Sequence, residues 1–154
     1  MMKPYFPARE SDPPPLRVQI KRTVRFEEVD SLGMVWHGRY PSFLEDARNA
    51  LGDKYGISYG DFFGHGVVVP IRKMHIDYHH PLRLRETAHI EGILQWSEAA
   101  RINLEYVIKN GEGRMTTSGY TVQMMLDIEE NIRMIPPPFY KAFLEKWKKG
   151  ELRR

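Results

Sequence analysis

Apolar and polar residues alternate along the segment 17–26, just after a proline-rich start. One face of this segment is basic and polar, and the other carries Val18, Ile20, Val24 and Phe26. Alternation with a period of two is typical of a β-strand that has one buried face. We therefore predict a strand over 17–26 with its apolar face in the core. Arg22 interrupts that face and marks an edge or interface position.

Four later segments alternate in the same way and are also predicted to be strands: 67–80, 86–96, 101–109 and 114–128. The sequence SEAA connects the second of these to the third, and KNGEG connects the third to the fourth. Asn-Gly is a strong signal for a tight hairpin turn. These strands are therefore expected to be antiparallel neighbours.

Helical periodicity replaces the alternation over 41–55. Pro41 suits the first turn of a helix, apolar residues recur at the spacing of one helix face, and Gly56 suits the C-terminal cap. The stretch 57–66 is rich in glycine and aromatic residues and is predicted to be a loop. A second helix is expected after the three prolines at 136–138.

The resulting order is strand, helix, four antiparallel strands and terminal helix, which predicts an α+β fold with one sheet wrapped around a central helix. No repeat or linker divides the 154 residues, a length that suits one core. We expect a single domain over residues 17–150. Residues 1–16 contain five prolines and are predicted to form an extended N-terminal arm.

Composition excludes several classes of function. The absence of cysteine rules out disulfides and thiolate metal sites. No apolar run reaches the roughly 18 residues of a membrane span, and the start has no apolar signal core, so a cytoplasmic protein without a membrane span is expected. The net charge of +3 suits an anionic ligand but is too small and too dispersed to indicate nucleic-acid binding.

The turn between the first predicted strand and the first predicted helix concentrates the candidate chemistry. It reads EEVDSLGMVWHGRYPSFLEDAR over residues 27–48, with Asp30 at the exit of the strand. A carboxylate close to the free amides of a helix N-terminus can activate a nucleophile while those amides stabilise an oxyanion. Taken by itself, Asp30 is better interpreted as a turn or capping residue.

The spacing of residues in this turn resembles the 4-hydroxybenzoyl-CoA thioesterase family, whose members have the hotdog fold. The family pattern D-x-x-G-x-V-x-[HNY]-x-x-Y, followed by E-x-A-R, is matched by Asp30, Gly33, Val35, His37 and Tyr40, and then by Glu45, Ala47 and Arg48. A second block, IDYHHPL, has Tyr78 followed three residues later by Pro81, as in the family. His37 resembles the acyl-CoA thioesterases of the Tol–Pal operon type, and Trp36 resembles the hydroxybenzoyl branch.

The resemblance implies hydrolysis of an acyl-CoA, or a related acyl thioester, to a free acid and a thiol. Asp30 would act as nucleophile or as general base on water, and His37 would position that water or support acid–base chemistry. Amides near His37 and Gly38 would form the oxyanion hole. The implied substrate-binding residues are Gly33, Trp36, Gly38 and Tyr40.

The resemblance also implies an oligomeric state, the absence of a cofactor and the partners of the chain. It points to a homodimer or homotetramer that needs no cofactor and no metal, with acyl carrier protein as a further candidate partner beside acyl-CoA. The main alternative function is a hotdog module that binds an acyl thioester or acyl carrier protein without hydrolysis. Such a module does not require Asp30, so an assay of thiol release separates the two functions.

Two further motifs on or after the helix have alternative interpretations. Glu45 could be a second catalytic acid, although an ion pair with Arg48, three residues later, is the preferred interpretation. GISYG at 56–60 fits a nucleophile elbow, but that motif works on a strained strand-to-helix turn of a large parallel sheet. We therefore expect Ser58 to be a loop residue.

The run HIDYHH raises the question of a metal site. His75, Asp77 and His79 would share one face of a strand, as metal ligands could. The preferred interpretation is that this polar face is exposed to solvent or to a neighbouring subunit, because that is the commoner place for such residues.

Overall fold

Five antiparallel strands form the main sheet of the computed structural model, which describes residues 4–152. Their order across the sheet is β1 (Leu16–Thr23), β4 (Thr87–Gln95), β5 (Arg101–Lys109), β6 (Met115–Met124) and β3 (Ile71–Tyr78). The predicted hairpins are confirmed, because β4 pairs with β5 and β5 with β6. β1 and β3 are the two edges. Residues 1–3 of the predicted arm, like 153–154, lie outside the described part of the chain.

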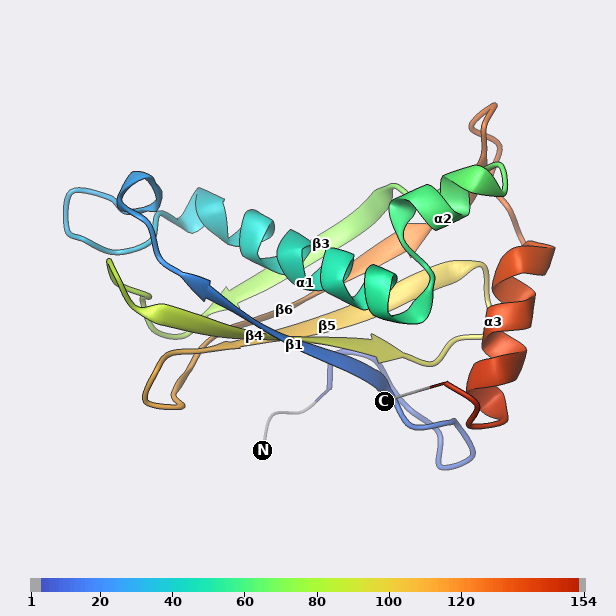
Figure 1. The fold of residues 1–154 in the computed structure, drawn as a ribbon, viewed down its shortest axis with the longest axis horizontal. Helices are drawn as coiled ribbons and strands as arrows, with labels where there is room; N and C mark the ends of the chain where they lie inside the picture. The colour runs from blue at the N-terminus through green and yellow to red at the C-terminus, as the bar shows by residue number, and fades with distance from the viewer. Residues whose placement is uncertain (1–3, 153–154) are drawn as a thin grey trace.

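The helix α1 (Tyr40–Tyr55) lies across one face of this sheet, as Figure 1 shows. Its side chains Phe43, Ala47 and Leu51 are fully buried in the core. Gly56 ends the helix in the left-handed conformation, with a φ of 71°, as predicted for a C-terminal cap. The predicted α+β architecture, an antiparallel sheet around a central helix, is confirmed. The face of the sheet away from α1 is called the outer face below.

Two predicted strands are broken, which the alternation did not reveal. The segment 67–80 divides into β2 (Val67–Val68) and β3, and 114–128 divides into β6 and β7 (Leu126–Asp127). β2 and β7 pair as a separate two-stranded sheet. Pro70 lies at the first break, where its lack of an N–H prevents a continuous ladder of hydrogen bonds.

The prediction of a loop over 57–66 is wrong, because a short helix, α2 (Tyr59–Gly64), lies there. Ser58 is its N-cap. The Ser58 hydroxyl accepts a hydrogen bond from the Asp61 amide at 3.0 Å, and the Asp61 carboxylate accepts one from the Ser58 amide at 3.0 Å. This reciprocal capping box, with Phe62 fully buried, stabilises one turn of helix in a glycine-rich segment.

The first strand is shorter than predicted, and Phe26 does not face the core. The chain leaves β1 after Thr23 and forms a 3-10 turn at Phe26–Glu28, where Phe26 is 80% exposed. The Glu28 carboxylate accepts a hydrogen bond from the Arg25 amide and forms an ion pair with Arg22. These contacts stabilise the 3-10 turn. The turn occupies the positions where the strand was expected to continue.

The terminal helix α3 (Pro138–Lys148) packs at one end of the sheet (Figure 1). Its Trp147 ring lies 5.0 Å from the Trp96 ring, and its indole N–H donates to the Pro14 carbonyl at 2.9 Å. Further back in the predicted arm, the Tyr5 hydroxyl donates to Asp77 at 2.7 Å, and burial raises the pKa of Tyr5 to about 12. The described part of the arm therefore contacts both α3 and the outer face of the sheet.

Candidate active site

The loop between β1 and α1 is folded around the Asp30 carboxylate. Asp30 Oδ1 accepts hydrogen bonds from the amides of Leu32 at 2.9 Å and Met34 at 3.2 Å. Gly33 adopts a φ of 77°, which only glycine takes without strain, and closes the turn. Because Oδ1 makes both bonds to the loop, Oδ2 has no hydrogen-bond donor among the described residues. One carboxylate oxygen thus shapes the loop and the other is available for chemistry.

The residues just before α1 form a 3-10 turn, His37–Arg39, that continues directly into the helix. The Trp36 indole lies against Gly38, where a Cβ atom would come within 2.2 Å of the ring, so any other residue at this position would have to displace the indole. Within residues 4–152 the amides of His37 and Gly38 have no hydrogen-bond acceptor. These two N–H groups at a helix entrance can therefore bind a developing negative charge.

A pocket of about 340 Å³ opens beside this loop. It is lined by Asp30, Met34, Val35, His37, Tyr40, Tyr78, His79, His80 and Pro81. The Tyr78 hydroxyl donates to the His37 carbonyl at 2.9 Å, and the Tyr78 ring meets the Tyr40 ring edge-on at 5.1 Å. Tyr40 is almost fully buried, and this burial raises its pKa above 10.0. This cavity is called the Asp30 pocket below.

The six predicted site residues all belong to this loop or to the start of α1, but only three line the Asp30 pocket. Asp30, His37 and Tyr40 do so. Gly33 shapes the turn, while Trp36 and Gly38 pack on each other beside His37, with the Trp36 and His37 rings 4.9 Å apart. The structure therefore brings the predicted residues into one small region.

Of the six lining residues that were not predicted as site residues, three carry polar groups: Tyr78, His79 and His80. They lie at the end of β3, some forty positions along the chain from His37. The block IDYHHPL, recognised in the sequence as a family match, was the available signal. Its proximity to the Asp30 loop comes from the hydrogen bond between the Val35 amide and the Leu82 carbonyl, at 2.8 Å, and from a bridge between Met34 and Arg83.

The predicted ion pair between Glu45 and Arg48 is wrong. Arg48 is 1% exposed and points into the core, where its guanidinium donates to Gln123 Oε1 at 2.6 Å and to the Ile57 carbonyl at 3.0 Å. Glu45 accepts instead from the Tyr59 hydroxyl at 3.4 Å. Buried carbonyl and amide oxygens take the place of a carboxylate for Nε and Nη2, while the buried Nη1 has no hydrogen-bond partner among residues 4–152. Glu45 does not line the Asp30 pocket.

The polar run on β3 does not assemble a metal site. His75 Nε2 lies 2.9 Å from Asp77 Oδ2, but His79 Nε2 meets the Ser118 hydroxyl at 2.8 Å. Hydrogen bonds from Tyr5 and then from His75 lower the pKa of Asp77. In the described chain, no group of three or more His, Asp or Glu side chains could hold a metal ion.

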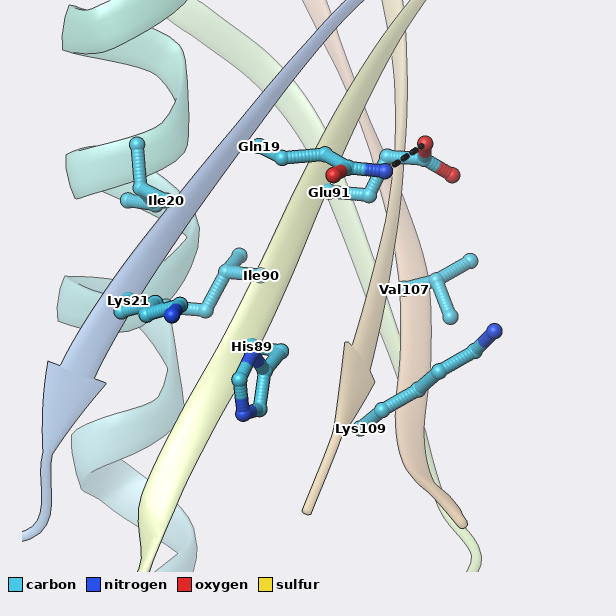
Figure 2. Close-up of a pocket in the computed structure, with 8 residues that line it drawn as sticks. All are labelled: Gln19, Ile20, Lys21, His89, Ile90, Glu91, Val107 and Lys109. Atoms are coloured by element: carbon cyan, nitrogen blue, oxygen red, sulfur yellow. Dashed lines mark hydrogen bonds between the residues drawn. The ribbon is translucent and has the colours of Figure 1, made fainter. Parts of the chain in front are cut away.

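Another hollow, of about 320 Å³, lies on the outer face over β1, β4 and β5 (Figure 2). Its polar side chains include Lys21, His89 and Lys109, and Gln19 donates to Glu91 at 3.2 Å. None of the predicted site residues lines it.

Across residues 4–152, no helix is long and apolar enough to cross a membrane.

Comparison with known proteins identifies the family of the chain. Residues 24–146 match the Thioesterase-like superfamily. YneP of Bacillus subtilis, a candidate acyl-CoA thioesterase by name, is 30% identical over 120 residues, covering 78% of this chain and 85% of YneP. The 1,4-dihydroxy-2-naphthoyl-CoA hydrolase of Thermosynechococcus vestitus is 28% identical over 129 residues, covering 82% of this chain and 88% of that enzyme.

Solved thioesterase structures share the fold of this chain. The DHNA-CoA thioesterase of Staphylococcus aureus superposes with a TM-score of 0.74 at 23% identity, over 88% of this chain and 90% of that one. The chain therefore belongs to the thioesterase-like superfamily and has the hotdog fold. The prediction of the broad family and its enzyme class is confirmed, while the assignment to a particular branch stays a prediction.

Proposed function

We propose that this chain hydrolyses an acyl-CoA thioester to a carboxylic acid and free coenzyme A in the Asp30 pocket. The observation that carries the proposal is the geometry of the loop before α1. An exposed carboxylate with one unbonded oxygen and two unbonded amides belong to the same short segment, and Asp30 and His37 line one pocket. Family membership supports the same chemistry.

Asp30 supplies the basic or nucleophilic group. As general base, it takes a proton from water while the water oxygen attacks the thioester carbonyl carbon. As nucleophile, Oδ2 attacks that carbon itself and forms an anhydride, which water then hydrolyses. Both routes use the oxygen that the loop leaves free. His37 lines the pocket and has the chemistry to position the water or exchange a proton with it.

The amides of His37 and Gly38 stabilise the oxyanion that forms when the carbonyl carbon becomes tetrahedral. Removing one such donor typically lowers kcat by about 10²–10³-fold. Collapse of the intermediate breaks the C–S bond and releases a thiolate, whose parent thiol has a pKa of about 8.5, if cysteine is a fair guide. Such a leaving group needs little help from a general acid, so one carboxylate and one helix entrance suffice.

The decisive variant is Asp30→Asn. The carboxamide oxygen can still accept the two loop hydrogen bonds, but it cannot act as base or nucleophile. We expect kcat/KM to fall by about 10²–10⁴-fold while the thermal midpoint stays close to that of the wild type. Thiol release, followed with a thiol-reactive dye, measures the loss.

Asp127→Asn is a matched control for this variant. Asp127 Oδ1 also accepts from the amides two and four residues later, those of Glu129 and Asn131, both at 2.9 Å, but it lies outside the Asp30 pocket. This control should keep full activity. If Asp30→Asn retains wild-type turnover, Asp30 has no role in the mechanism. If the wild type releases no thiol from any acyl thioester, a binding module becomes the better description.

The choice of acyl group and carrier calls for a substrate panel. The solved relative named as a DHNA-CoA thioesterase and the naphthoyl-CoA hydrolase suggest hydroxyaromatic acyl groups. The hydroxybenzoyl resemblance suggests 4-hydroxybenzoyl groups, and aliphatic groups of several lengths complete the range. A panel of these acyl-CoA esters, with acyl carrier protein loaded with the same groups, ranks them by kcat/KM. We propose coenzyme A as the carrier, for the reason argued in the next section.

A further inference from the structure

A β-bulge in β3 places two basic side chains together. Ile71 pairs with Gln123 of β6 and Lys73 pairs with Val122, so Arg72 is an extra residue between two consecutive pairs. In a regular strand, Arg72 and Lys73 would point to opposite faces. A bulge redirects side chains, and here both residues line one hollow.

Arg101 completes a group of three cations in this hollow, whose volume is about 150 Å³. Arg101 begins β5 and pairs with Met124, so it lies two strands from the β3 edge. Its Nε donates to Asn103 Oδ1 at 2.8 Å, which orients the guanidinium. Val122 and Met124 contribute the apolar lining. We call this the cation hollow.

The cations of this hollow have no carboxylate partner. Among residues 4–152, the ion pairs of the chain involve none of Arg72, Lys73 and Arg101. Positive charges gathered in one hollow repel each other unless an anion lies between them. The outer hollow of Figure 2 differs, because Glu91 there is bonded to Gln19 and forms an ion pair with Arg17.

Protection of an exposed edge strand is the simpler explanation for basic residues on β3. That explanation accounts for a single Lys or Arg on β3 itself. It does not account for Arg101, which comes from the interior strand β5, or for the bulge that brings Arg72 beside Lys73. Three donors that converge from two strands on one hollow fit a multiply charged phosphate ligand better.

We propose that Arg72, Lys73 and Arg101 form the subsite that binds the phosphates of coenzyme A. This inference rests on the proposed function. In one chain the cation hollow and the Asp30 pocket lie at opposite ends of β3, on the order of 20 Å apart for six residues of extended strand. If a second copy pairs antiparallel along β3, the Arg72 end of one copy lies beside the Tyr78 end of the other. The pantetheine arm of coenzyme A then connects a thioester in one pocket to phosphates in the facing hollow.

The test is a triple variant, Arg72→Gln, Lys73→Gln and Arg101→Gln, assayed with two substrates. The first is the best acyl-CoA of the panel, and the second carries the same acyl group on N-acetylcysteamine, which has no phosphate. We expect the ratio of kcat/KM for the CoA ester to that for the N-acetylcysteamine ester to fall at least tenfold, which corresponds to about 1.4 kcal/mol. The increase of KM with ionic strength should weaken as well.

A matched control removes three charges elsewhere on the surface: Lys21→Gln, Lys109→Gln and Arg114→Gln. The net charge changes equally, but Lys21 and Lys109 line the outer hollow and Arg114 is exposed in a hairpin. This control should leave the substrate ratio unchanged. Light scattering on both variants verifies that the assembly is the same as in the wild type. An equal fall of the ratio in both triple variants would show a general charge effect and overturn the proposed subsite.

Calorimetry with free coenzyme A separates this inference from the proposed function. The wild type should bind coenzyme A at least tenfold more tightly than the triple variant, whether or not any thioester is hydrolysed. Absence of hydrolysis with this difference intact would remove the hydrolase and keep the subsite. Equal affinities for the two proteins would overturn the subsite and leave the hydrolase standing. Titration with 3′-dephospho-coenzyme A then shows whether the 3′-phosphate or the diphosphate is bound.

Discussion

Arg22 shows how one residue can depart from a pattern for a structural reason. It occupies a position of β1 that the alternation assigns to the core. Its guanidinium forms ion pairs with Glu28 and, at 3.0 Å, with Asp46, and it lies 3.8 Å above the Phe43 ring. Glu28 is only 3% exposed, so Arg22 neutralises a nearly buried carboxylate. Arg22 thus connects β1, the 3-10 turn and α1.

The variant Arg22→Met should therefore be strongly destabilised. It keeps much of the apolar stem but leaves Glu28 without a cation, and we expect the free energy of unfolding to fall by about 2–3 kcal/mol, between the values for exposed and for buried pairs. Chemical denaturation measures this. Arg17→Met, which removes a partner of Glu91 from a side chain 52% exposed, should cost less than about 1 kcal/mol. Equal losses would show that Arg22 acts only as surface charge.

At the residue scale, the sequence predicted the acid and the helix entrance of the site but not all of its walls. Asp30, His37 and Tyr40 belong to one short segment, so their spacing along the chain is enough to bring them together. Tyr78 ends another strand and His79 follows it, and their place depends on pairing between the Asp30 loop and the segment after β3. Local periodicity does not contain that information.

At the element scale, α2 depends on the capping box between Ser58 and Asp61. Hydrogen bonds from the Ser58 hydroxyl, at 2.7 Å, and from the Ser58 amide lower the pKa of Asp61 below 3.8. A carboxylate whose pKa is lower in the folded state stabilises that state above its unfolded pKa. The stabilisation is lost as the pH falls through the folded pKa. The cap is therefore sensitive to acid.

We expect Asp61→Asn to lower the free energy of unfolding by up to about 1 kcal/mol at pH 6. The difference from the wild type should start to shrink as the pH falls below 3.8, and it should vanish once the pH is below the lowered folded pKa, where the wild-type carboxylate is protonated too. Urea unfolding at pH 6 and at pH 3 tests this. Glu98→Gln, an exposed carboxylate outside α2, serves as control and should show no such difference. A gap that does not shrink between pH 6 and pH 3 would rule out the charged cap as its cause.

Periodicity predicted the elements that a single repeat dominates and missed those that one contact decides. The apolar stripe of α1 and the alternation of β4 and β5 extend over many residues, and both predictions are confirmed. The break at Pro70 depends on one missing N–H, and the helix after Ser58 depends on one residue pair, Ser58 and Asp61. S-x-x-D at 58–61 was a readable capping signal, but a glycine-rich composition favoured a loop.

At the scale of the whole molecule, the two edges of the main sheet differ. β1 carries Arg17, Gln19 and Lys21 along its outer side. On β3, the side facing α1 is apolar, and Ile71, Met74 and Tyr78 are 41%, 36% and 52% exposed. An edge strand presents unpaired N–H and C=O groups that another strand can bind. An exposed apolar row beside such an edge favours pairing with a second copy.

We therefore expect a dimer with a mass of about twice 18.1 kDa, formed by antiparallel pairing of two β3 strands. Met74→Glu tests this, because residues near the middle of β3 face their own copies across the two-fold axis, and two carboxylates there would repel each other. The variant should be monomeric by light scattering and should lose acyl-CoA hydrolysis, since the cation hollow and the Asp30 pocket then no longer meet. Lys21→Glu, the same kind of change on β1, should remain dimeric and active. A fully active monomeric wild type would contradict the pairing and require one chain to bind the whole substrate.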